Sequence, residues 1–278
     1  MDCYFWRYEL VSKRRLSAIA GRRFGALIRV GDGFADVHPW PELGDLPLDE
    51  QLSLLACGTT TRLTARSLHF AALDAAARAE SRSLFDGLVI PPSHWPGADP
   101  PASFDVAKVK SLETLPERVR LRIDFNATLT AEQFLRLELP RERIDFVEDP
   151  CPYDGATWRM LRERTGVRLA LDREVAEDGV DVLVVKPALQ EMPLSTSMTS
   201  REIVVTSYMD HAIGQMFAAY VAASHAIANT CGLFTHVLYE VDSFFDRIRA
   251  DGPRLLAPAG TGIGFDDLLE SLPWKKLA

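Results

Sequence analysis

Residues 121–124 read Leu-Arg-Ile-Asp and residues 144–148 read Ile-Asp-Phe-Val-Glu, so two apolar runs each end on an acid. Residues 169–172, Leu-Ala-Leu-Asp, repeat the pattern, and the three terminal acids are spaced 24 residues apart. That interval is close to the length of one strand plus one helix, which predicts repeated β/α units. Because parallel strands end at the same side of a sheet or barrel, the three acids are expected to lie close together.

Strand-like and helix-like segments alternate through most of the chain. We expect strands at 104–110, 119–124, 144–148, 167–172, 180–186 and 202–207, and helices at 130–137, 154–165 and 211–228. This pattern predicts an α/β fold of the modified (β/α) TIM-barrel type. Only about a dozen residues separate Lys110 from Asp124, so we expect a shortened barrel with one or two outer helices missing. An open doubly wound sheet is the alternative.

The N-terminal part has a different pattern. A glycine turn within residues 27–37 predicts a β-hairpin, and the alanine-rich stretch 64–83 predicts a helix. We therefore expect an α+β capping domain at 1–84 and a barrel domain at 85–254, with the tail from about 255 to 278 packing back on the cap.

The segment between these two parts is rich in proline. Residues 91–101 contain five prolines and a glycine, which predicts a loop after a short strand at 88–90. The loop contains His94. Five histidines show no spacing typical of metal ligands, and we interpret them as packing or surface residues: His38, His69, His94, His225 and His236.

The composition excludes several classes of protein. The net charge of -8 and the pI near 5.3 argue against a nucleic-acid partner, which requires clustered positive charge. No run of about 18 apolar residues predicts a membrane span, and the first residues do not resemble a secretory signal, so we expect a cytoplasmic protein. The four cysteines form no CxxC pair, so neither a zinc site nor a disulfide framework is predicted.

Lysine is rare in this chain and lies at unusual positions. Of 31 basic residues only six are lysines, and Lys108, Lys110 and Lys186 lie in or beside apolar strand-like runs. Lys108 and Lys110 would project from one face of a strand, because they are two residues apart. A lysine can lose its proton when it is desolvated, which arginine cannot do. The alternatives are a solvated edge strand for the pair, and for Lys186 either a side chain that reaches the rim or a Schiff-base nucleophile.

The three strand-ending acids have the chemistry of a metal site. Asp124, Glu148 and Asp172 would supply the hard oxygen ligands that Mg²⁺ prefers. Each acid taken alone could instead cap the following helix. Three carboxylates gathered without a cation would destabilise the fold, so the combination favours a metal ion.

Taken together, residues 104–214 resemble the enolase superfamily, and within it most closely the o-succinylbenzoate synthase family. The matching motifs are Lys108-Val109-Lys110, Asp124-Phe125-Asn126, Glu148-Asp149-Pro150-Cys151, Leu171-Asp172 and Lys186-Pro187. A looser match at 33–39 has Asp36 where the family has glutamate, and Asp210 replaces a glutamate of a later loop.

The resemblance implies a Mg²⁺-dependent enzyme, with Mn²⁺ as a second suitable ion, that acts on a small-molecule carboxylate. The reaction would be the dehydration of 2-succinyl-6-hydroxy-2,4-cyclohexadiene-1-carboxylate to 2-succinylbenzoate in menaquinone biosynthesis. The implied roles are metal binding by Asp124, Glu148 and Asp172, proton removal by Lys110, charge stabilisation by Lys186, and support by Lys108, Asn126 and Asp210.

Other functions are compatible with the same residues. Two lysines on opposite faces of a substrate would also suit an N-acylamino-acid racemase or a dipeptide epimerase of this superfamily. A third alternative is a non-catalytic binding protein that keeps the barrel. The oligomeric state is left open by the sequence, which is compatible with a monomer.

Overall fold

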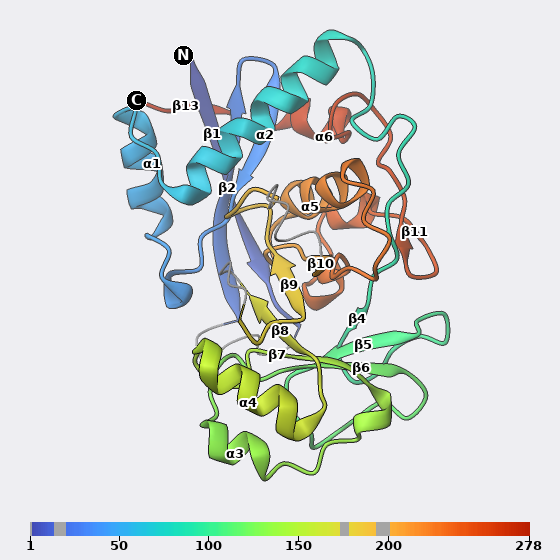
Figure 1. Ribbon diagram of the computed structural model, residues 1–278. Helices are drawn as coiled ribbons and strands as arrows, with labels where there is room; N and C mark the ends of the chain where they lie inside the picture. Colours follow the sequence, from blue (N-terminus) through green and yellow to red (C-terminus); the bar gives the residue numbers. More distant parts are fainter. Residues whose placement is uncertain (1, 14–20, 173–177, 193–200) are drawn as a thin grey trace.

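The N-terminal residues form an antiparallel sheet covered by two helices. The computed structural model describes residues 2–13, 21–172, 178–192 and 201–278. The sheet order is β13-β1-β2-β3, and the predicted hairpin is confirmed as β2 and β3 (Figure 1). The elements of this cap are β1 (Cys3–Val11), β2 (Arg22–Val30), β3 (Gly33–Val37), α1 (Leu48–Ala56), α2 (Arg62–Ala79) and β13 (Lys275–Lys276).

The central part of the chain forms a curled parallel sheet. The strands follow the order β10-β9-β8-β7-β6-β5-β4, with every neighbouring pair parallel. They are β4 (Trp95–Pro96), β5 (Val106–Val109), β6 (Arg120–Asp124), β7 (Ile144–Glu148), β8 (Leu169–Asp172), β9 (Val182–Val185) and β10 (Glu202–Val205). The predicted α/β barrel with an α+β cap is confirmed.

A short segment between the two edges of this sheet closes the ring. Gly232 forms a parallel bridge with Thr206 beyond the end of β10, and Cys231 forms one with Ser93 just before β4. The backbone N–H groups of Gly232 and His94 donate to the carbonyls of Val205 and Cys231, at 2.8 Å each. Residues 231–232 therefore take the position of an eighth strand.

The prediction of a strand at 88–90 is wrong, because these residues form no strand. The first barrel strand is β4, which lies inside the proline-rich segment that the sequence predicts to be a loop. Trp95 and Pro96 pair with Ala107 and Lys108 of β5. Proline is tolerated because this strand has only two residues and so needs few ladder hydrogen bonds.

Two connections of the barrel lack an outer helix. Residues 97–105 and 110–119 contain no helix, which confirms the expected shortening. The remaining helical and short elements are α3 (Ala131–Leu135), α4 (Gly155–Thr165), α5 (Ala212–Ser224), α6 (Asp266–Ser271), β11 (Ala250–Asp251) and β12 (Arg254–Leu255). Among the described residues, no helix is both long and apolar enough to cross a membrane.

The barrel strands bury apolar side chains on both faces. Leu121, Ile123 and Val147 pack outward with Trp158 and Leu161 of α4. A second cluster fills the interior and comprises Phe146, Ala170, Val182, Val184 and Val204. Burial on both faces explains why these strands read as nearly continuous apolar runs.

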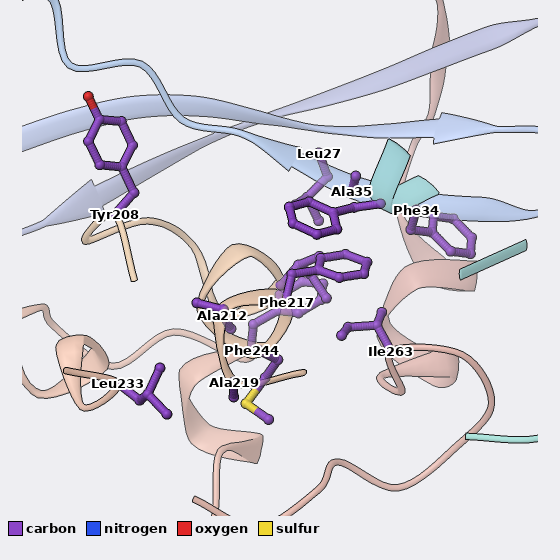
Figure 2. Close-up of a cluster of buried hydrophobic side chains, with 14 of the residues drawn as sticks. Leu27, Phe34, Ala35, Tyr208, Ala212, Phe217, Ala219, Leu233, Phe244 and Ile263 are labelled. Carbon is purple, nitrogen blue, oxygen red and sulfur yellow. The ribbon is translucent and has the colours of Figure 1, made fainter. Parts of the chain in front are cut away.

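The cap is attached to the barrel through α5. Phe217 and Ala212 of α5 lie beneath the cap strands that carry Leu27 and Ala35, as Figure 2 shows. The ring of Phe70 in α2 stacks on Phe217, with 4.6 Å between the centroids. This continuous apolar interface fixes the cap over one side of the barrel.

The C-terminal tail returns to the cap. Strand β13 pairs with Tyr4 and Phe5 of β1. Asp74 of α2, which is fully buried, accepts hydrogen bonds from the backbone N–H groups of Phe34 (2.9 Å) and Ile263 (2.6 Å). Asp74 therefore links the cap sheet, α2 and the tail.

Replacing Asp74 with alanine should lower the free energy of unfolding by about 3 kcal/mol, because two buried N–H groups and the paired Arg78 would lose their acceptor. Chemical denaturation followed by circular dichroism measures this change. The exposed Asp32→Ala variant is the control and should change stability by less than about 0.5 kcal/mol. Equal stability of Asp74→Ala and the wild type would contradict this role.

Candidate active site

A cavity of about 610 Å³ opens at the carboxyl ends of the barrel strands. Trp40 and Leu43 of the cap line one side of it. The indole N–H of Trp40 donates to the carbonyl of Tyr208 at 2.9 Å, and the Tyr208 hydroxyl donates to Asp45 at 2.9 Å. The cap and the loop after β10 are thus joined at the cavity wall.

Two of the predicted metal ligands lie side by side. Asp124 and Glu148 are paired in register at the ends of β6 and β7, and both are almost fully buried. The Lys108 Nζ lies 3.1 Å from Asp124 Oδ2 and 2.7 Å from Glu148 Oε1. The Lys108 ammonium group therefore offsets negative charge on both carboxylates.

The third predicted ligand is paired with the second predicted catalytic lysine. Asp172 ends β8 and forms an ion pair with Lys186, which is 7% exposed. Asn126 lies nearby, and its backbone N–H donates to Asp124 Oδ1 at 2.9 Å. Asn126 adopts a left-handed conformation with φ of 49°, which bends the chain away at the end of β6. Asp124, Asn126, Asp172 and Lys186 all line the cavity.

Lys110 projects into the same cavity. Its Nζ lies 3.9 Å from Asp124 Oδ2, and its side chain is half exposed. Partial desolvation lowers the pKa of Lys110, and the positive charges of Lys108 and Lys186 add to this effect against the opposing charge of Asp124. The amine can therefore lose its proton more readily than an ordinary lysine.

The carboxylates around Lys108 make the centre of this site favourable for a positive charge. Burial alone would lower the pKa of Lys108, but the combined charges of Asp124, Glu148 and Asp172 outweigh it, and the pKa rises. Burial and the neighbouring carboxylates raise the pKa of Asp149 to about 8. The carboxylates are thus close enough to interact with one another as well as with Lys108.

The donor set has the chemistry of a hard-cation site. Three carboxylates from consecutive strands act together on the Lys108 ammonium, and such oxygen donors suit Mg²⁺. In the described part of the chain, no three His, Cys, Asp or Glu side chains already form a cluster suited to a metal ion. The three carboxylates are instead paired with Lys108 and Lys186.

The structure does not bring Asp210 into the cavity. Asp210 lies between the cap and α5, next to Asp36, and both carboxyl groups lie against Gly214. A Cβ on Gly214 would be 2.4 Å from Asp210 Oδ2 and 2.7 Å from Asp36 Oδ2, so only glycine fits there. Asp36 also accepts hydrogen bonds from the Tyr8 hydroxyl (2.6 Å) and the His211 N–H (3.1 Å). The two departures from the family pattern therefore lie against the same glycine at the domain interface.

Sequence reasoning missed three residues at or beneath the cavity: Trp40, His94 and Arg122. Arg122 is fully buried and lies two residues before Asp124. An arginine within an apolar strand is unusual, and this feature of the sequence could have identified it. The sequence predicts His94 to be a packing or surface residue, and the structure places it on the cavity wall. This position was hidden because the residues that follow it, which form β4, are predicted from the sequence to be a loop.

Comparison with known proteins agrees with this fold. A member of the enolase superfamily from Listeria innocua has a TM-score of 0.74 at 15% identity, covering 100% of this chain and 99% of that chain. A dipeptide epimerase from Cytophaga hutchinsonii, complexed with Mg and a dipeptide, gives the same TM-score, identity and coverage. The molecule thus has the fold of the enolase superfamily.

Sequence comparison defines the family more closely. Residues 3–77 match the model of the O-succinylbenzoate synthase N-terminal domain. An o-succinylbenzoate synthase from Bdellovibrio bacteriovorus is 35% identical to this chain, and the alignment covers 97% of each of the two chains. The chain belongs to the o-succinylbenzoate synthase family.

The burial of Asp36 at the domain interface predicts a pH-dependent stability. Burial raises the pKa of Asp36 to about 7, so the folded state keeps a proton that the unfolded state has lost above about pH 4. Stability from this group is therefore present below pH 4 and lost as pH rises to about 7. The Asp36→Asn variant lacks this titrating group, so its free energy of unfolding should not fall in this way. The difference in free energy of unfolding between the wild type and the variant should therefore shrink between pH 4 and pH 7. A gap that stays constant in chemical denaturation across this range would contradict the prediction.

Proposed function

We propose that the protein dehydrates 2-succinyl-6-hydroxy-2,4-cyclohexadiene-1-carboxylate to 2-succinylbenzoate, with Mg²⁺ as its cofactor, in cytoplasmic menaquinone biosynthesis. The single observation that carries the proposal is that Lys110 and Lys186 line one cavity together with Asp124 and Asp172, while Glu148 is paired with Lys108 beside it. Family membership supports the choice of reaction.

The charges of the site are complementary to this substrate. Three lysines, Lys108, Lys110 and Lys186, and three acids, Asp124, Glu148 and Asp172, balance when all are ionised. Addition of a divalent ion would leave two positive charges, or one when Lys110 is neutral. The substrate carries two carboxylates, so its charge is opposite in sign to that of the loaded site.

Lys110 would act as the base. Its lowered pKa makes the neutral amine easier to form, and in that form Nζ takes the proton from the ring carbon that bears the carboxylate. The protonated Lys110 then gives this proton to the departing 6-hydroxyl group, which leaves as water. The C–H and C–O bonds break, a ring double bond forms, and the ring becomes aromatic.

Lys186 would keep its proton throughout. It is buried and paired with Asp172, so its ammonium group presents fixed positive charge to the carboxylate as negative charge builds there. When bound by Asp124, Glu148 and Asp172, a divalent ion supplies Lewis acidity to the same substrate group. Asn126 would support this arrangement by fixing the orientation of Asp124.

Replacing Lys110 with alanine should reduce kcat by at least about 100-fold, because the acid–base group is lost. The assay adds the cyclohexadiene substrate and Mg²⁺ and follows the absorbance of the aromatic product. Lys275→Ala, on the exposed C-terminal strand, is the matched control and should keep wild-type activity. Epimerisation of a dipeptide by the wild type without formation of the aromatic product would reject the proposed reaction.

Replacing Asp124 with asparagine should weaken Mg²⁺ binding at least about 10-fold, because Mg²⁺ depends on carboxylate charge. Isothermal titration of the chelator-treated protein measures the affinity without any substrate. The exposed Asp251→Asn variant should bind Mg²⁺ like the wild type. Unchanged affinity in Asp124→Asn would exclude Asp124 as a ligand.

A further inference from the structure

His94 lies on the cavity wall where β4 begins. The backbone N–H of His94 donates to the carbonyl of Cys231, and His94 is only 5% exposed. A Cβ on Gly232 would be 2.8 Å from the His94 Cε1 and 3.1 Å from Nε2, so this edge of the imidazole lies directly against a glycine that also lines the cavity. The ring is therefore held with its Nε2 edge at the wall.

The hydrogen bond at the other ring nitrogen fixes the protonation of His94. The Arg122 Nη1 lies 3.0 Å from His94 Nδ1, and a guanidinium group can only donate. Nδ1 therefore accepts, so the imidazole is neutral and carries its proton on Nε2. Burial and then the positive charges of Arg122 and Lys108 lower the pKa of His94, which agrees with a neutral ring.

Arg122 is itself fixed from beneath the cavity. Its Nε donates to Asp145 Oδ2 at 2.8 Å, and its guanidinium lies 4.6 Å from the centre of the Phe146 ring. Asp145 is buried and also pairs with Arg120. The chain of contacts from Asp145 through Arg122 to His94 sets which ring nitrogen of His94 carries the proton.

The Nε2–H group makes no hydrogen bond to the described residues. The wall near it, formed by Thr206, Gly232 and neighbouring residues, has no acidic side chain, whereas the acids and lysines lie on the strands from β5 to β9. In the proposed reaction the ring carboxylate is bound at that charged side. The acceptor oxygens left for His94 belong to the succinyl arm of the substrate.

We propose that His94 donates a hydrogen bond from Nε2 to an oxygen of the succinyl arm, and that Arg122 is the positioning residue that fixes this donor. This assignment rests on the proposed function and deepens it. It makes His94 a determinant of specificity, because a substrate without an acceptor on this arm leaves the donor unpaired.

Binding of the product to the Mg²⁺-loaded enzyme tests the contact directly. In His94→Phe, the Kd of 2-succinylbenzoate should rise about 10- to 100-fold, since a buried hydrogen bond is lost, while the Kd of benzoate should change less than about 2-fold. His94→Gln should recover most of the affinity, because its amide offers an acceptor to Arg122 and a donor to the cavity. Unchanged product binding in His94→Phe, or an equal loss for benzoate, would overturn the proposal.

A third ligand, 2-butanoylbenzoate, distinguishes the two kinds of oxygen on the arm, because it keeps the ketone and lacks the terminal carboxylate. A loss of its affinity in His94→Phe assigns the contact to the ketone oxygen. An unchanged affinity, with a loss for the product, assigns it to the carboxylate.

Nitrogen NMR of the histidine-labelled wild type tests the role of Arg122 without any substrate. The His94 ring should carry its proton on Nε2 between pH 6 and pH 8, and a proton on Nδ1 would overturn the assignment. Failure of the wild type to form 2-succinylbenzoate would instead reject the proposed function, and the two failures are therefore separable.

Discussion

The ion pair between Lys108 and the carboxylates of Asp124 and Glu148 is the interaction on which the site depends. Burying two adjacent acids costs free energy unless a cation accompanies them, and Lys108 supplies that cation from the neighbouring strand. The same geometry creates a position that favours positive charge, where a divalent ion would gain most. Lys110, just beyond the end of β5, remains near this charge and is partly desolvated, which lowers its pKa.

The cap and the barrel are coupled through α5. Its apolar face packs on Leu27 and Phe70, and its glycine at 214 lets Asp36 of the cap approach Asp210 of the barrel. The cap then places Trp40 at the cavity wall. The cavity is therefore lined by both domains, although the clustered lysines and acids belong to the barrel.

Much of the barrel could be predicted from sequence because strands buried on both faces leave long apolar runs, and the polar residues that end them stand out. Asp124, Glu148, Lys108 and Lys186 were found in this way. Strand β4 was missed because it has two residues, one of them proline, and is defined only by pairing with β5. His94 was missed for the same reason, since its role depends on contacts with distant residues. The placement of Asp210 away from the cavity likewise depends on packing that no local pattern records.

The central proposal is that a single divalent ion and the two lysines surround the reacting carbon. A crystal structure of the protein with Mg²⁺ and 2-succinylbenzoate tests it most directly. We expect one ion bound by Asp124, Glu148 and Asp172, with Lys110 and Lys186 on opposite faces of the aromatic ring. An ion bound elsewhere, or both lysines on one face of the ring, would contradict it.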